Sequence, residues 1–127
     1  MSDIPELNDD MFWTLIATAN QDDVAFRKKL ESLSRVELIG FSWKFKDLMG
    51  RLYEVMDDQN ELSEDELEDL VAWIVARGKE FYRNVLDNPK QMPKKANYDE
   101  PGLDTHFQAI KVYYDRFGEH IPAYPNG

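Results

Sequence analysis

Acidic side chains are concentrated in one short stretch of this 127-residue sequence. Between positions 54 and 69 there are no bases and nine acids: Glu54, Asp57, Asp58, Glu61, Glu64, Asp65, Glu66, Glu68 and Asp69. Acids just after Ser63 complement the dipole of a helix that begins there, whereas Asp57, Asp58 and Glu61 precede it and gain little. A negative corner of this kind suits capture of a basic protein surface, chiefly by raising the association rate. The alternative is an ordinary solvated surface.

Calcium binding is a second chemistry that dense carboxylates suggest. Asp57 and Glu68 have the first-to-last ligand spacing of a calcium-binding loop. However, Leu62 stands where the sharp turn of that loop requires glycine, and Gln59 and Glu61 stand where Asp or Asn is usual. The sequence therefore predicts no calcium site here.

Other catalytic and metal-binding patterns are also missing from the sequence. The only histidines, His106 and His120, have no metal-ligand spacing around them, and there is no cysteine and no G-x-S-x-G. Arg77-Gly78-Lys79 has one glycine inside a helical segment, whereas a phosphate loop needs several glycines between a strand and a helix. We predict no catalytic residue, no metal, no cofactor and no enzyme activity.

The overall charge narrows the class of partner. The formal net charge is −10, from 25 acids and 15 bases, which disfavours binding to nucleic acid or to an anionic membrane. The acidic start MSDIPELNDD is unlike a signal peptide, and no apolar run approaches the roughly 20 residues that cross a bilayer. We expect a cytoplasmic protein whose partner is a basic protein.

Two capping boxes predict the helices that position the acidic stretch. The pattern L-S-x-x-E-L occurs at positions 33–38 and 62–67, and in each the Ser and Glu can cap a helix reciprocally. The first box predicts a helix over about 35–56, with a buried stripe at Leu38, Phe41, Phe45, Leu48, Leu52 and Val55. The second predicts a helix over about 64–87, with a stripe at Leu67, Val71, Ile74, Gly78, Phe81 and Val85. We expect Gly78 to lie where two helices approach closely.

Shorter helices complete the predicted fold. Asn8 or Asp9 can cap one, Asp22 can cap another, and a last helix should begin near Leu103 or Asp104 and end at Gly118. That last helix carries Phe107, Ile110, Tyr113, Tyr114 and Phe117. With no alternation typical of strands, we predict an all-α, compact single-domain bundle of about five helices over 1–127, with irregular ends at 1–7 and 119–127 and a surface loop at 88–102.

Trp73 and Arg77 lie one turn apart, off the main stripe. They form either a partner-facing patch or a second packing face. Our predicted partner-binding set joins the tryptophan to the acids: Glu54, Asp57, Asp58, Glu61, Glu64, Asp65, Glu68 and Trp73.

Several segments together are similar to one family. They are Phe12-Trp13-x-Leu15-Ile16, LSRVEL with Phe41, the run from Trp73 to Tyr82, Leu86-x-Asn88-Pro89, and Ala109 to Pro122 with its Tyr113-Tyr114 and Gly118. The chain resembles the bacterial family catalogued as domain of unknown function 4240, with W-[IL]-x-x-x-G-[KR]-E-x-[YF] as the most specific run. Positions 57–60 depart from the pattern, which often has a glycine there. The resemblance implies an all-helical bacterial cytoplasmic protein and no particular activity.

Small size, acidity and the missing active site favour one functional hypothesis. It is an immunity or antitoxin-type protein, which neutralises a basic, nuclease-like toxin by masking its charged surface. The alternatives are an enzyme or small-ligand-binding domain with an interhelical pocket lined by Trp13, Trp43 or Tyr82, or a regulatory or scaffolding domain.

Overall fold

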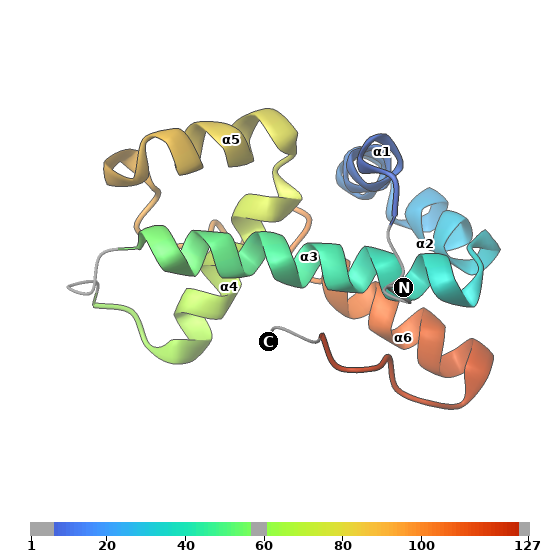
Figure 1. Cartoon of the computed structure of the whole chain (residues 1–127). Coiled ribbons are helices and arrows are strands. Elements are labelled where there is room, and N and C mark those ends of the chain that lie inside the picture. The colour runs from blue at the N-terminus through green and yellow to red at the C-terminus, as the bar shows by residue number, and fades with distance from the viewer. Residues whose placement is uncertain (1–6, 57–60, 125–127) are drawn as a thin grey trace.

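The computed structural model describes residues 7–56 and 61–124, which form six α-helices and one short 3-10 helix (Figure 1). The elements are α1 (Asp9–Gln21), α2 (Asp23–Ser32), α3 (Arg35–Val55), α4 (Glu64–Ala76), α5 (Lys79–Asp87), the 3-10 helix η1 (Pro89–Gln91) and α6 (Thr105–Phe117). No strand occurs in these residues. The prediction of an all-α fold is confirmed, with one more helix than expected.

Both predicted capping boxes are present and set the starts of α3 and α4. The Ser34 hydroxyl accepts from the Glu37 amide at 3.1 Å, and the Glu37 carboxylate accepts from the Ser34 amide at 2.9 Å. Ser63 and Glu66 repeat this exchange at 3.2 and 3.1 Å. These bonds satisfy amides that have no partner within the helix, so each helix begins where its box lies.

The predicted helix over 64–87 is wrong in one respect, because it is broken at Gly78. The helix α4 ends at Ala76, and Gly78 has φ 114° and ψ 170° before α5 starts at Lys79. This region of backbone conformation is open essentially to glycine alone. No atom lies within 4 Å of the place where a Cβ would be, so the expected close approach of two helices at Gly78 is also wrong.

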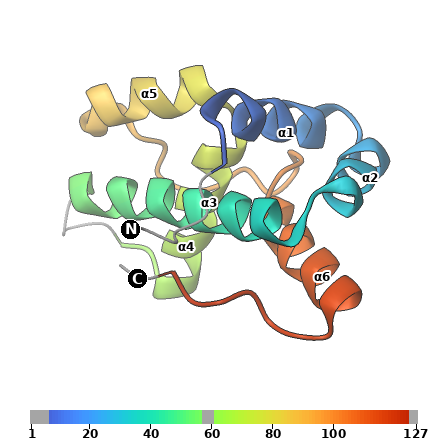
Figure 2. The same cartoon turned by 45° about the vertical axis from the view of Figure 1, so that its right-hand side comes forward.

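The long helix α3 occupies the middle of the molecule (Figures 1 and 2). The helices α1 and α5 lie on one side of it and α6 lies on the other, while α4 crosses it and contacts α1, α3 and α5. The core centres on four fully buried phenylalanines, Phe12, Phe26, Phe41 and Phe45. Phe41 contacts the other three, with ring centroids 5.1 to 6.2 Å apart.

The aromatic residues of α6 differ in how far they are buried. Phe107 and Tyr114 are 63% and 48% exposed, whereas Ala109, Val112 and Tyr113 are buried. The aromatic residues of α6 therefore cover two faces of the helix, and only one of them reaches the core. Gly118 ends the helix with φ 69°, as its left-handed cap requires.

The segments outside the helices still make specific contacts. The 88–102 segment contains η1 and buries Ala96, although most of it lies on the surface as predicted. The described part of the carboxyl-terminal tail, 119–124, has no helix and runs back along α3, where the Trp43 indole donates to the Pro122 carbonyl at 2.7 Å. Within the described residues, no helix has the length and hydropathy needed to span a membrane.

Candidate functional site

The predicted partner-binding residues do not form one cluster. Glu54 is exposed near the end of α3, Glu61 is exposed before α4, and Glu64, Asp65 and Glu68 are exposed in the first turns of α4. Asp57 and Asp58 lie outside the described residues. The described acids nonetheless lie at the end of α3 and around the start of α4, and two of them, Glu54 and Glu68, line the same hollow.

The negative corner has lysines beside it that the local sequence does not reveal. Glu61 lines a broad apolar hollow together with Lys90, Lys94 and Lys95 of the 88–102 segment. The pKa of Glu66 is lowered, first by its hydrogen bonds with Ser63 and also by the charge of Lys95. Although the stretch from 54 to 69 contains no base, three lysines from another segment therefore lie near its acids on the Glu61 side.

Trp73 belongs to the core, so its assignment as a partner-binding residue is wrong. Its side chain is only 7% exposed and meets Phe81 edge-on, with ring centroids 5.7 Å apart. The Arg77 guanidinium lies 5.1 Å from the Trp73 ring centroid. Trp73 and Arg77 therefore form a packing face within the protein and not a patch that faces a partner.

Arg77 ties three segments together at the junction of α4 and α5. Its guanidinium forms an ion pair with Glu100 at 2.6 Å, donates to the Asn20 side chain at 3.2 Å and donates to the Pro101 carbonyl. Asn20 in turn donates to the Ala76 carbonyl at 2.5 Å. Within the most family-specific run of the sequence, Arg77 thus fixes the end of α4 against α1 and the 97–102 segment, which we call the Arg77 junction.

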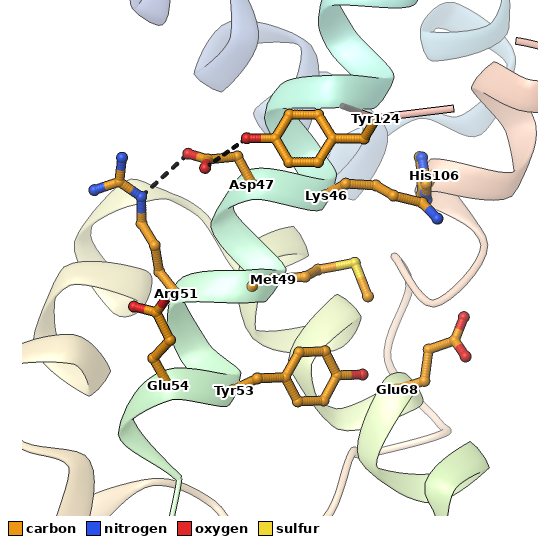
Figure 3. A pocket seen from close by; sticks show the side chains of 10 residues that line it. Lys46, Asp47, Met49, Arg51, Tyr53, Glu54, Glu68, His106 and Tyr124 are labelled. Atoms are coloured by element: carbon orange, nitrogen blue, oxygen red, sulfur yellow. Dashed lines mark hydrogen bonds and ion pairs between the residues drawn. The ribbon is translucent and has the colours of Figure 1, made fainter. Parts of the chain in front are cut away.

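An open hollow lies where α3, α4 and α6 meet, and Figure 3 shows its side chains. Its volume is about 610 Å³. The residues that line it are Lys46, Asp47, Met49, Gly50, Arg51, Tyr53, Glu54, Glu68, His106 and Tyr124. We call this the α3–α4–α6 hollow. It contains two of the predicted partner-binding residues, Glu54 and Glu68.

His106 forms one wall of the hollow through a contact that sequence reasoning missed. Its Nε2 is joined to the buried Ser42 hydroxyl by a hydrogen bond of 2.8 Å, and its ring stacks on Phe45 with centroids 4.9 Å apart and planes 6° apart. Burial, with a smaller contribution from the charge of Lys46, lowers the pKa of His106 to about 4. The imidazole is therefore neutral near pH 7.

The Ser42–His106 pair resembles part of a hydrolase site but lacks two of its features. Ser42 is only 3% exposed, so a substrate cannot reach its hydroxyl. Among the described residues, no carboxylate is hydrogen-bonded to His106 to orient the ring as in a catalytic triad. The pair fixes α6 against α3 and presents the imidazole to the hollow.

One side of the hollow is a closed polar network. The Asp47 carboxylate accepts from Arg51 at 3.1 Å and from the Tyr124 hydroxyl at 2.9 Å, as the dashed lines in Figure 3 mark. The hydrogen bond to Asp47, together with the charge of that carboxylate, raises the pKa of Arg51. Because these groups satisfy one another, they shape the hollow more than they offer charge to a ligand.

The opposite side carries an exposed tyrosine and carboxylates. Tyr53 is 44% exposed, and its hydroxyl points toward Glu68 in Figure 3. Burial and the charge of Glu68 raise the pKa of Tyr53. Within residues 7–56 and 61–124, neither Glu54 nor Glu68 forms an ion pair. Glu54 and Glu68 thus line the hollow as carboxylates that are not held in an ion pair by any described residue.

The three residues named for an alternative pocket, Trp13, Trp43 and Tyr82, line neither of the two hollows. Trp13 packs against Phe12 and Tyr82, with ring centroids 5.0 and 5.9 Å apart. Tyr82 is 3% exposed and donates to the Leu48 carbonyl at 2.7 Å, and burial raises its pKa to about 12. These aromatic residues pack in the bundle, and none of the three lines either hollow.

A metal site would need several ligating side chains close together. No group of three or more His, Asp or Glu side chains that could hold a metal ion occurs in the part of the chain that the structure describes.

Comparison with known proteins gives one match. Neither a curated protein nor a solved structure matches the chain at a significant level. A family profile described as "Protein of unknown function (DUF4240)" matches residues 7–116, which include α1 to α5 and nearly all of α6. Because this match extends over most of the sequence, the chain belongs to the DUF4240 family.

Proposed function

We propose that this chain is a cytoplasmic protein-binding protein that captures a basic protein in a one-to-one complex, in the manner of an immunity protein or antitoxin. The observation that carries the proposal is the set of exposed carboxylates on the adjoining ends of α3 and α4: Glu54, Glu64, Asp65 and Glu68. Within the described residues none of them forms an ion pair. Unpaired carboxylates attract a basic surface and can cover the groove of a nuclease.

Tyr53 supports the same face as a binding surface. Exposed tyrosines are common anchors in protein interfaces, because the ring buries a large area and the hydroxyl bonds at the rim. Tyr53 lies beside Glu54 in the chain and its hydroxyl points toward Glu68. Lys90, Lys94 and Lys95 lie on the Glu61 side, so we place the centre of the interface at Tyr53 and not at Glu61.

The proposal is tested by capturing the partner and reversing the charge. The tagged protein is first used to purify partners from its native host and to bind the product of the neighbouring gene. We then compare a triple variant, Glu54→Lys, Asp65→Lys and Glu68→Lys, with a matched triple variant of exposed acids elsewhere, Glu31→Lys, Glu80→Lys and Asp87→Lys.

The two triple variants have the same net charge, so they separate a local interface from a general charge effect. We expect the first to weaken binding at least a hundredfold and the second less than tenfold, with most of the change in the association rate at low salt. Equal losses for both variants, or a partner that is itself acidic, would contradict the proposal. Circular dichroism confirms that both variants remain helical.

A further inference from the structure

The α3–α4–α6 hollow has unpaired charges of opposite sign on its two sides. Lys46 lies on one side, and it forms no ion pair with any residue that the structure describes. Glu68 lies on the other side, beyond the Tyr53 hydroxyl, with Met49 between the two sides in Figure 3, and Glu54 lies at the far end of Tyr53, next to Arg51. Neither acid forms an ion pair in the described residues. A ligand that fits both sides has to carry an anionic group and a cationic group.

We propose that this hollow binds a molecule with a carboxylate at one end and a guanidinium or ammonium at the other, as in free arginine or the carboxyl-terminal arginine of a peptide. The carboxylate binds at Lys46 and His106, and the cationic group binds at Glu68 beside the Tyr53 hydroxyl. The peptide form of this ligand rests on the proposed function, because it names a feature that a basic partner presents. The free amino acid does not depend on that function.

The wall at His106 is built to hold a carboxylate in one position. Ser42 and Phe45 fix the ring on both its edge and its face, so it cannot turn freely. Its Nε2 is bonded to Ser42, and its Nδ1 makes no hydrogen bond to any residue in the described part of the chain. In the tautomer in which Ser42 donates to Nε2, Nδ1 carries the proton and can donate to a carboxylate. Lys46, whose side chain ends beside His106 in Figure 3, supplies the charge.

The size and the charge of the hollow fit a ligand of this class. A volume of about 610 Å³ lies within the range of roughly 300–1,000 Å³ that is usual for small-ligand sites. Arg51 and Asp47 neutralise each other, so Lys46 against Glu54 and Glu68 leaves a net charge of −1. Free arginine carries a net charge of +1, from one carboxylate and two cationic groups, and so complements the net charge of the hollow, whereas the carboxyl-terminal arginine of a peptide carries one charge of each sign and no net charge.

The test compares ligands that differ only at the carboxylate. Amide resonances of the ¹⁵N-labelled protein are followed while L-arginine, agmatine (which lacks the carboxylate), acetyl-Gly-Arg and acetyl-Gly-Arg-amide are added to about 10 mM. We expect L-arginine to shift resonances near positions 46–54, 68 and 106. We expect agmatine and the amidated peptide to bind at least tenfold more weakly than their counterparts with a carboxylate. Binding of acetyl-Gly-Arg identifies a peptide terminus as a ligand, and binding of L-arginine alone identifies the free amino acid.

Variants assign the two ends of the ligand. Lys46→Ala should weaken L-arginine about tenfold and should keep or improve the binding of agmatine, whereas Glu68→Gln should weaken both. Lys28→Ala, an exposed lysine on α2, is the matched control and should change neither. Equal binding of L-arginine and agmatine, or no shift at the highest concentration, would overturn the proposal.

The same variants separate this proposal from the capture of a basic protein. Removing the positive charge of Lys46 does not weaken attraction of a basic surface, so Lys46→Ala should keep or improve binding of a basic protein partner. Loss of arginine binding with the protein complex intact would show that the hollow is a separate ligand site. If the unmodified protein binds no arginine but the charge-reversed triple variant loses the protein complex, the proposal of an arginine site is refuted and the proposed capture of a basic protein stands.

Discussion

Arg77 and Lys46 are both cations close to the surface of helices, but their surroundings differ completely. Arg77 has only 13% of its side chain exposed and is bound by Glu100, Asn20 and the Pro101 carbonyl. Lys46 is exposed, and within the described residues it has no ion-pair partner, although carboxylates line the same hollow. Apart from Nε, which is buried without a hydrogen-bond partner in the described residues, the Arg77 guanidinium is bound by its neighbours. In the α3–α4–α6 hollow, by contrast, Lys46, Glu54 and Glu68 form no ion pair with any described residue.

This difference separates a structural role from a binding role. Buried charges that are fully paired hold segments together, and removing one leaves its partners unsatisfied. Exposed charges that are unpaired around a concave surface contribute little to the stability of the fold, and they can form ion pairs with a ligand. The run from Trp73 to Tyr82 contains a site of the first kind at Arg77, and we propose that the second kind, around Tyr53, binds a ligand.

The largest loss of stability is expected when the Arg77 side chain is removed from the Arg77 junction. Arg77→Ala should lower the free energy of unfolding by about 3–4 kcal/mol, since it removes an ion pair and leaves partly buried acceptors without a donor. Denaturation with guanidinium chloride measures the change. The exposed pair of Lys111 and Asp115 supplies the control, and Lys111→Ala should cost less than about 1 kcal/mol. Similar losses in the two variants would show that the junction is not special.

The second prediction concerns the His106 wall of the hollow and depends on pH. In the unfolded chain His106 takes up a proton near pH 6.5, but in the folded protein only near pH 4. As the pH falls between these values the unfolded state binds more protons, so stability is lost, reaching about 3 kcal/mol at pH 4. Above pH 6.5 both states are neutral and the effect disappears.

A variant isolates this contribution from that of the many carboxylates. His106→Gln can still bond to Ser42 but does not titrate. Urea denaturation of both proteins at pH 7 and at pH 4 gives the difference, and we expect the unmodified protein to lose about 3 kcal/mol more. Parallel losses in both proteins would show that His106 titrates normally and that the wall is open to water.

The third prediction concerns Gly78, which lies beside Arg77 at the break between α4 and α5. Gly78→Ala should destabilise the protein by about 2 kcal/mol, because its φ of 114° is unfavourable for any residue with a Cβ. Steric contact is not the cause, since the added methyl group meets no atom within 4 Å. An increase in the melting temperature of Gly78→Ala would contradict this explanation.

The smallest effect on stability is expected from Gly50→Ala, the same substitution at a glycine that lines the α3–α4–α6 hollow. Gly50 lies within α3, and an added Cβ there also meets no atom within 4 Å. Gly50→Ala should therefore stabilise the protein by about 0.5–1 kcal/mol, through helix propensity alone. Thermal unfolding of the two alanine variants side by side separates backbone conformation from packing. A loss of stability in Gly50→Ala would show that the hollow is more tightly packed than its open shape indicates.

The sequence predicted those features that depend on neighbours along the chain. The starts of α3 and α4 could be placed because Ser34 and Ser63 bond to residues three positions further on. The all-helical class followed from hydrophobic spacing, and the exposed acids could be located within one stretch. The break at Gly78 could not be found in this way, because the apolar positions keep a helical spacing straight through it.

Only the tertiary structure decided which distant groups meet. It brings Ser42 beside His106 although they are 64 positions apart, and it puts Lys90, Lys94 and Lys95 next to a stretch of sequence that has no base of its own. The physical reason is that capping and periodicity are local interactions, whereas these contacts depend on how helices cross and on where the 88–102 segment folds back. The sequence thus determined the helices and their acidic ends, and the packing of those helices determined which charges remain unpaired for a ligand.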